Sequence, residues 1–231
     1  MRCLAIVLLF IVAVWAVEHG PFTEDFITFL KRSSFQEKGH KSSELYGITY
    51  GTRDVYTAGD NRISCKDILS LRRLIKAVLE YTKSEKIDIV VHSTGVSLAR
   101  KAIYGGTATL SGETCTIGDS LVGKIDSLVG LAGANYGMCL CFTEGLADKN
   151  DYSKVLKQIN AEADDGPKIN FIASVYTKND AVIGADSKVW GRRTAVIPGS
   201  DFEFEFDDKT HWELKDSTAP MQYALVTKHR R

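Results

Sequence analysis

A serine at a junction between a strand-like and a helix-like segment is the residue of this chain best suited to chemistry. Ser93 follows the apolar, β-branched run Ile87–His92 and precedes residues 96–103, which favour a helix. A sharp turn there lifts the hydroxyl clear of the strand, and the helix N-terminus favours the oxyanion that forms when the hydroxyl attacks a carbonyl. The pattern predicts ester hydrolysis with Ser93 as the nucleophile.

A serine hydroxyl needs a histidine to take its proton and a carboxylate to hold that histidine in the right tautomer. In α/β-hydrolases the chain order is Ser, then Asp or Glu, then His. His19 and His40 precede the serine, His92 is adjacent to it on the strand, and His229 lies two residues from the C-terminus. His211 remains and is the predicted base.

The acid should follow a strand that lies between the nucleophile and the base. Asp180 does so, four residues past the apolar run at 171–176. Asp186 is the nearest competitor, whereas Asp207 and Asp208 lie too close to the base in sequence to approach it from another loop. Asp180 is therefore the predicted acid.

Each of these residues also has an ordinary structural interpretation. A serine before x-Gly is commonly a turn residue, Asp180 could form a turn or cap a helix, and a histidine near a C-terminal helix is commonly solvated. Val91 stands where the elbow motif has its first glycine. The strand before Ser93, the helix after it and the order Ser, Asp, His together favour catalysis. Trp212 could line the acyl site.

The elements that must position these residues alternate between strands and helices along the chain. Strands are expected over residues 44–50, 87–92, 124–135, 168–176, 194–197 and 202–206, and helices over 22–31, 65–83, 96–104, 151–162 and 219–229. This alternation predicts an α/β fold with a mostly parallel sheet and helices on both faces.

Length and charge narrow the class of protein. The 231 residues suit one domain, and 29 Lys plus Arg balance 29 Asp plus Glu. Because no basic patch or stripe stands out, nucleic acid is not an expected partner. The predicted chemistry needs no metal or organic cofactor.

The N-terminus has the pattern of a secretory signal peptide. Arg2 precedes an uncharged apolar run at 4–16 that is too short to span a bilayer and ends near small residues. Cleavage after Ala16 is expected, leaving residues 17–231 as a single hydrolase domain. No later segment is apolar enough to cross a membrane, so a secreted, extracellular protein is predicted.

Four cysteines remain after that cleavage. An even number in an exported chain permits two disulfides. Cys139 and Cys141 are too close in sequence for an unstrained bridge, so each is expected to pair with Cys65 or Cys115. The Cys-x-Cys pair lacks a second pair at zinc-ligand spacing.

Several blocks in the same order resemble the secreted class 2 triacylglycerol lipases. The resemblance runs from about Ser43 to the C-terminus. The matching blocks lie at residues 43–47, 71–75 with 81–82, 88–103 with 105–106, 129–135, 175–184, 210–211 and 219–223.

The resemblance implies a compact α/β-hydrolase with Ser93 as nucleophile, Asp180 as acid and His211 as base. It also implies that the backbone N–H of Thr94 is one oxyanion donor and that the substrate is a lipid ester, at a lipid–water interface. The family has an early strand ending in His-Gly-x, whose loop supplies the second donor. Here no such strand is expected between the signal-like start and residue 45, and His19-Gly20 is followed by proline, which has no N–H.

The sequence supports two candidate functions. The first is a secreted serine carboxylic-ester hydrolase, a triacylglycerol lipase or esterase of lipid catabolism that works through an acyl-enzyme. The alternative is a catalytically silent homologue that binds lipid or another protein after losing its oxyanion loop.

Overall fold

A six-stranded parallel sheet forms the centre of the molecule. The computed structural model describes residues 5–9, 34–48, 63–110, 112–137, 155–161, 168–189 and 191–229. The strand order is β10-β7-β6-β3-β1-β2, and every neighbouring pair is parallel. Its strands are β1 (Ala5–Leu9), β2 (Leu45–Ile48), β3 (Ile87–His92), β6 (Ile125–Leu131), β7 (Phe171–Thr177) and β10 (Phe202–Phe206). The predicted mostly parallel sheet is confirmed.

Strands β3 and β7 are buried along their length because helices cover both faces of the sheet. Every residue of β3 and β7 is buried, which is why their sequences are almost continuously apolar. The edge strand β10 alternates phenylalanine with glutamate and is only half-buried. Continuous and alternating apolar patterns thus distinguish inner from edge strands here.

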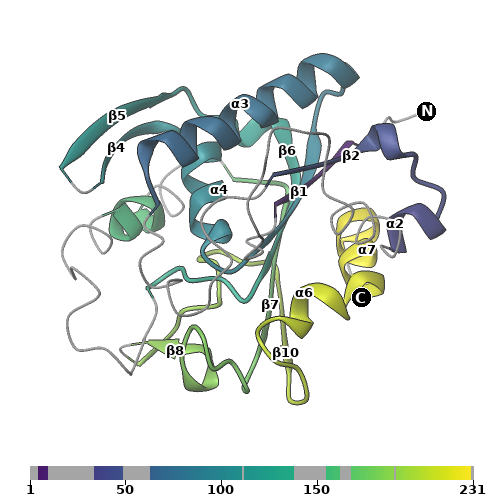
Figure 1. Ribbon diagram of the computed structural model, residues 1–231, viewed down its shortest axis with the longest axis vertical. Coiled ribbons are helices and arrows are strands. Elements are labelled where there is room, and N and C mark those ends of the chain that lie inside the picture. The colour runs from purple at the N-terminus through teal and green to yellow at the C-terminus, as the bar shows by residue number, and fades with distance from the viewer. Residues whose placement is uncertain are drawn as a thin grey trace, which may run out of the picture.

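Helices lie on the two faces in separate groups (Figure 1). Strand β3 contributes to both apolar clusters, with Ile89 in the one that contains α3 and α4 and Val90 in the one that contains α7. The helices are α2 (Ser34–Glu37), α3 (Cys65–Thr82), α4 (Gly95–Tyr104), α6 (Glu213–Asp216) and α7 (Ala219–Lys228), with 3-10 turns at Ser42–Glu44, Val122–Lys124 and Ala185–Ser187.

Helix α3 begins where its sequence supplies a capping box. The Asp67 N–H donates to Ser64 Oγ, and the Ser64 N–H donates to Asp67 Oδ2 at 3.0 Å. The predicted helices over 65–83 and 219–229 agree with α3 and α7 to within a residue. Residues 155–161 are helical, inside the predicted 151–162, whereas the predicted helix at 22–31 lies outside the described residues.

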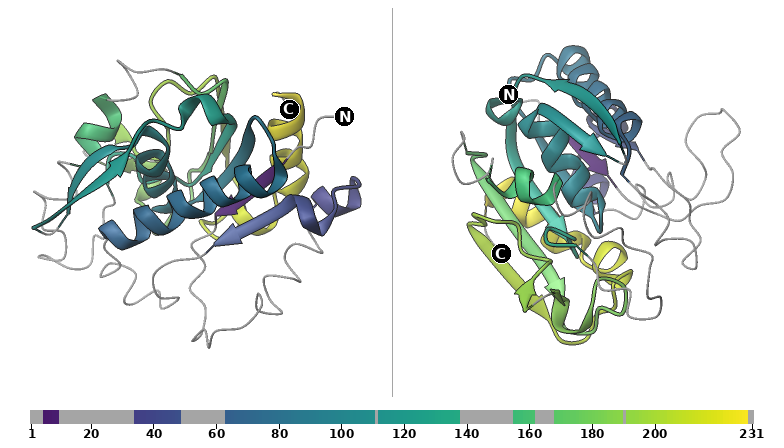
Figure 2. Two further views of the ribbon diagram at one scale, coloured as in Figure 1. Left: turned by 90° about the horizontal axis from the view of Figure 1, so that it is seen from above. Right: turned by 90° about the vertical axis from the view of Figure 1, so that its left-hand side faces the viewer.

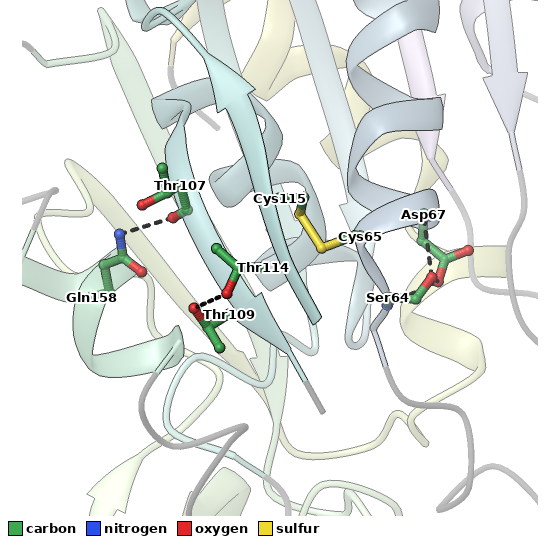
Figure 3. The surroundings of a disulfide bond; sticks show 8 residues. All are labelled: Ser64, Cys65, Asp67, Thr107, Thr109, Thr114, Cys115 and Gln158. Atoms are coloured by element: carbon green, nitrogen blue, oxygen red, sulfur yellow. Dashed lines mark hydrogen bonds between the residues drawn. A yellow bond between two sulfur atoms is a disulfide. The ribbon is translucent and has the colours of Figure 1, made fainter. Parts of the chain in front are cut away.

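A two-stranded hairpin beside α3 was not expected from the sequence. Strand β4 (Gly106–Leu110) pairs antiparallel with β5 (Glu113–Gly118) and lies outside the main sheet (Figure 2). A disulfide between Cys65 and Cys115 joins the first residue of α3 to β5 (Figure 3). The prediction that Cys139 and Cys141 each pair with one of these two cysteines is therefore wrong, since Cys65 and Cys115 bond to each other. Cys139 and Cys141 lie outside the described residues.

The predicted strand at 194–197 is also wrong. The short strand there is β9 (Arg192–Arg193), which pairs with β8 (Lys188–Val189), and the chain then turns. The apolar residues Ala195 and Ile197 are buried in a loop, whose backbone is satisfied by other partners: the Thr194 N–H donates to the Ser187 carbonyl, and the Ile197 N–H to Ser174 Oγ. Burial without strand pairing explains the misleading apolar run.

Strand β1 occupies the position where no strand was expected. Ala5–Leu9 lies between β2 and β3, with Ile6 in register with both Leu45 and Asp88. This segment belongs to the predicted signal peptide, whose cleavage site after Ala16 lies outside the described residues. Signal removal and a place in the mature sheet exclude each other, so the N-terminus of the mature protein decides between them.

Candidate active site

Ser93 lies at a strained turn between β3 and α4. Its φ is +58°, in the left-handed region that costs a non-glycine residue about 1–3 kcal/mol. The Ser93 N–H donates to the Leu131 carbonyl at 2.8 Å, and the Val96 N–H donates to the Ser93 carbonyl at 3.1 Å. These bonds hold the turn between the neighbouring strand and the helix, and they give Ser93 the backbone of a nucleophile elbow.

Val91, at the position of the motif's first glycine, lies beside a glycine on the adjacent strand. Val91 is in register with Gly130 on β6, so the two residues share a face of the sheet. A Cβ on Gly130 would lie 2.7 Å from Ile197 Cδ1 and 3.3 Å from Val96 Cγ1. Gly130 thus leaves room for the side chains of Ile197 and Val96 to pack on β6.

Asp180 and His211 form a buried pair at the carboxyl edge of the sheet. Asp180 follows β7, and its Oδ2 lies 2.7 Å from His211 Nδ1. The side chains are 0% and 2% exposed, respectively. Asp180 Oδ1 accepts the N–H groups of Val182 and Ile183, each at 2.9 Å. The carboxylate is therefore fixed on both oxygens and sets the tautomer in which His211 Nδ1 carries the proton.

The competing carboxylates are engaged elsewhere or exposed. Asp207 pairs with Lys178 at 2.5 Å, Asp208 pairs with Lys209 at 2.9 Å, and Asp186 is exposed. The choice of Asp180 as the partner of His211 agrees with the geometry.

Two of the competing histidines, His40 and His229, contact other residues. His40 lies 3.5 Å from Glu44, and His229 Nε2 lies 3.2 Å from Ser127 Oγ, at the start of β6. His19 lies outside the described residues.

The third contact of a serine triad is not formed in this structure. His211 Nε2 is buried and has no hydrogen-bond partner among the described residues, so Ser93 Oγ does not donate to it. Catalytic hydrogen bonds are often long before substrate binds and tighten in the complex. Ser93 is 6% exposed. The structure thus brings Asp180 and His211 together, and it places Ser93 directly after β3, which β6 separates from β7 in the sheet, without a bond to the base.

His92 is the residue of this region that sequence reasoning missed. It is 0% exposed, and its Nε2 lies 2.9 Å from the His211 carbonyl oxygen. The two imidazole rings are 4.6 Å apart between centroids. Its position next to the serine excluded it as the base, but alternation along a strand could not show what its ring would meet 119 residues later in the chain.

The predicted oxyanion donor is the backbone N–H of Thr94. Thr94 follows Ser93 and directly precedes α4. The backbone angles of Thr94 are φ −61° and ψ −17°. Strand β1 ends at Leu9 beside β3, and the residues after it, including His19, Gly20 and Pro21, lie outside the described residues.

The described residues contain no group of three or more His, Cys, Asp or Glu side chains able to hold a metal ion. None of the described helices is long and apolar enough to cross a membrane.

Comparison with known families identifies the chain. The model of the family "Lipase (class 2)" matches residues 17–224. The chain belongs to the class 2 lipase family. Comparison with curated protein sequences gives no match.

Solved structures of low sequence identity share the fold of this class 2 lipase. Bacillus licheniformis lipase BlEst2 in its mature form has a TM-score of 0.55 at 11% identity, covering 96% of this chain and 91% of that one. The product of gene lin2722 from Listeria innocua has a TM-score of 0.54 at 12% identity, covering 99% and 95%. These likenesses confirm the α/β-hydrolase fold.

Phospholipase PlaB from Legionella pneumophila is 14% identical to this chain. The match covers 75% of this chain but only 38% of the length of PlaB. The TM-score of 0.44 is too low for that likeness to support an argument.

Proposed function

We propose that this class 2 lipase is a secreted serine carboxylic-ester hydrolase, a triacylglycerol lipase or esterase that acts on lipid esters through Ser93, Asp180 and His211. The observation that carries the proposal is the buried Asp180–His211 pair, whose Oδ2 and Nδ1 atoms are 2.7 Å apart. The pair lies at the edge of the sheet where Ser93 follows β3 with a φ of +58°. A buried pair with this geometry orients an imidazole as a general base.

The proposed reaction has two half-reactions. Ser93 Oγ attacks the acyl carbon while its proton passes to His211 Nε2, and the Thr94 N–H donates to the oxyanion. The imidazolium, stabilised by Asp180, then protonates the leaving alcohol as the carbon–oxygen bond breaks and an acyl-enzyme remains. Water, deprotonated by His211, attacks that acyl group and releases the carboxylic acid and the free serine.

The environment of His211 Nε2 suits this role. Because Nδ1 faces the Asp180 carboxylate, Nε2 is left with the lone pair that a base requires. The atom is buried and has no hydrogen-bond partner in the described part of the chain, so no protein group there competes with the serine proton. Movement of either side chain on substrate binding completes the triad.

Secretion is supported by the composition of residues 1–16 and by the disulfide between Cys65 and Cys115, because disulfides persist in oxidising compartments. A lipid ester as substrate is supported by membership of the class 2 lipase family.

A catalytically silent protein that binds lipid or another protein is the second candidate. The missing bond between Ser93 and His211 favours it, as does Pro21, which follows His19-Gly20 and has no N–H to donate to an oxyanion. Loss of one oxyanion donor typically lowers kcat by ~10²–10³.

Labelling with a fluorophosphonate probe separates the two candidates. Wild type is expected to form a covalent adduct at Ser93, and the Ser93→Ala variant none. Ser97→Ala is the matched control, because Ser97 is a buried serine four residues away whose hydroxyl donates to the Ala134 carbonyl at 3.0 Å. Folded wild type that never labels would support the silent protein, and labelling that persists in Ser93→Ala would refute the mechanism.

A further inference from the structure

We propose that His92 is a positioning residue that holds the catalytic base His211 through a hydrogen bond to its backbone. The inference rests on the proposed function, and it concerns a side chain that plays no part in the proton transfers above. His92 is the last residue of β3 and precedes the nucleophile directly.

The hydrogen bond has one possible direction. A carbonyl oxygen only accepts, so His92 Nε2 carries the proton and donates to the His211 oxygen at 2.9 Å. Both residues are almost completely buried, which makes an unpaired carbonyl there costly. Neutral His92 with its proton on Nε2 is sufficient for this role.

Aromatic packing supports the same arrangement. The His92 ring is tilted by 56° against the His211 ring, with centroids 4.6 Å apart. Trp212 lies against both, 5.9 Å from His92 and 5.1 Å from His211 between ring centroids. His92 therefore supports the base through its backbone and through its ring.

Other contacts hold the loop that carries the base, and Asp180 holds its imidazole, whereas His92 binds its backbone carbonyl. The Thr177 hydroxyl donates to the Lys209 carbonyl at 2.6 Å, and the Thr210 N–H donates to Glu213 Oε2 at 2.8 Å. These bonds anchor the residues before His211 to β7 and to the first turn of α6. The His92 bond joins the base directly to the strand of the nucleophile, so it sets the two reacting groups relative to each other.

Displacement of a reacting group by about 1 Å lowers a rate by up to ~10²-fold. Loss of the His92 bond is therefore expected to lower kcat, while KM stays unchanged because a fully buried ring does not touch substrate. A looser base also loses contact with Asp180, which stabilises its imidazolium. The acidic limb of the kcat/KM profile should move to lower pH as a result.

Two substitutions separate the hydrogen bond from the packing. His92→Gln keeps an N–H at about the position of Nε2 but removes the ring, and His92→Phe keeps a ring but removes the donor. His229→Gln is the matched control, a histidine at the opposite end of the sheet whose Nε2 lies 3.2 Å from Ser127 Oγ.

Steady-state hydrolysis of a short-chain ester and the rate of fluorophosphonate labelling are measured from pH 5 to 9. His92→Phe should lose about 10- to 100-fold in kcat and in labelling rate, with its acidic limb shifted. His92→Gln should stay within a few-fold of wild type, with an unshifted profile, and His229→Gln should match wild type.

These measurements distinguish a failure of the proposed function from a failure of the role of His92. Wild type that does not label at Ser93 overturns the proposed function and this inference with it. Wild type that labels, with His92→Phe as fast and with the same pH profile, overturns only the role of His92.

A measurement on wild type covers the case in which His92→Phe does not fold. Nitrogen-15 NMR of the imidazole groups reports which nitrogen carries the proton. A proton on His92 Nε2 is expected, and a His92 protonated on Nδ1 alone would refute the bond.

Discussion

Asp180 Oδ2 lies 2.7 Å from His211 Nδ1, and the other oxygen of the same carboxylate accepts two backbone N–H groups. The carboxylate is thereby fixed before any substrate arrives. Since both side chains are buried, little water competes for the bond. The pair spans 31 residues and joins the loop after β7 to the turn before α6.

Asp180→Asn is expected to lower kcat by ~10⁴-fold with little change in fold. The amide NH₂ would donate to His211 Nδ1, so the imidazole proton would move to Nε2 and block acceptance of the serine proton. Steady-state ester hydrolysis measures the loss. Asp186→Asn is the control, since Asp186 is exposed and already has a left-handed backbone that Asn tolerates. Equal losses in both variants would contradict the assignment of the acid.

A second buried carboxylate lies near the other end of β3 and affects stability. Asp88 is 0% exposed, and the interaction with Ser127 that lowers its pKa only partly offsets the effect of burial. Burial raises the pKa of Asp88 to about 7, and the neighbouring Asp126 charge adds to the rise. The folded protein therefore holds this proton more tightly than the unfolded chain, whose aspartates have a pKa near ~3.9.

The free energy of unfolding should fall as pH rises from about 4 to about 7, and this contribution should level off above pH 7. Its slope is at most ~1.4 kcal/mol per pH unit. Asp88→Asn removes the titration, so the difference in stability between variant and wild type should shift in favour of the variant as pH rises. Urea unfolding of both proteins at pH 5, 6, 7 and 8 measures this difference. A pH-independent difference would contradict the buried, protonated carboxyl.

The Cys65–Cys115 disulfide closes a loop with a sequence separation of 50 residues. The chain-entropy model gives such a loop about 4 kcal/mol, and native disulfides typically contribute about 2–5 kcal/mol. The double substitution Cys65→Ala and Cys115→Ala should lower the free energy of unfolding by this amount, as measured by urea denaturation. Activity per folded molecule should persist, because the bond joins α3 to the hairpin and not to the site (Figure 3). Unchanged stability would indicate that the bond does not form.

The parts of the fold that the sequence predicts are those with a strong local pattern. Helix α3 has a helical apolar period and its own capping box, and β3 and β7 are continuous apolar runs. The junction of β3 with α4 is local as well, so Ser93 could be found from its neighbours alone. Asp180 and His211 followed from their order along the chain, because parallel strands bring their carboxyl ends to one edge.

The parts that escaped prediction depend on contacts distant in sequence. The β4–β5 hairpin is short, and although it alternates buried Ala108, Leu110 and Ile117 with exposed threonines, its apolar face packs against α3, which is distant in sequence. The bond from His92 to His211 spans 119 residues and has no local signature. The apolar run at residues 5–9 fits either a signal peptide or a buried parallel strand, since composition alone does not distinguish the two.

The N-terminus of the mature protein decides between those two roles. Signal cleavage predicts that the exported protein begins at residue 17, and intact-mass spectrometry with N-terminal sequencing of the purified protein measures this. A mature chain that retains residues 5–9 would contradict cleavage after Ala16 and would agree with β1 as a strand of the sheet. Cleavage would instead remove the hydrogen-bonding partner of both β2 and β3.

The same experiment has a consequence for Asp88, which is in register with Ile6 of β1. Without β1, the edge of β3 beside Asp88 is uncovered, and the burial that raises the pKa of this carboxyl is reduced. A chain that begins at residue 17 should therefore show a weaker loss of stability between pH 5 and 7 than a chain that retains residues 1–16. Urea unfolding of the two chains at those pH values makes the comparison. Equal pH slopes would show that β1 does not cover Asp88.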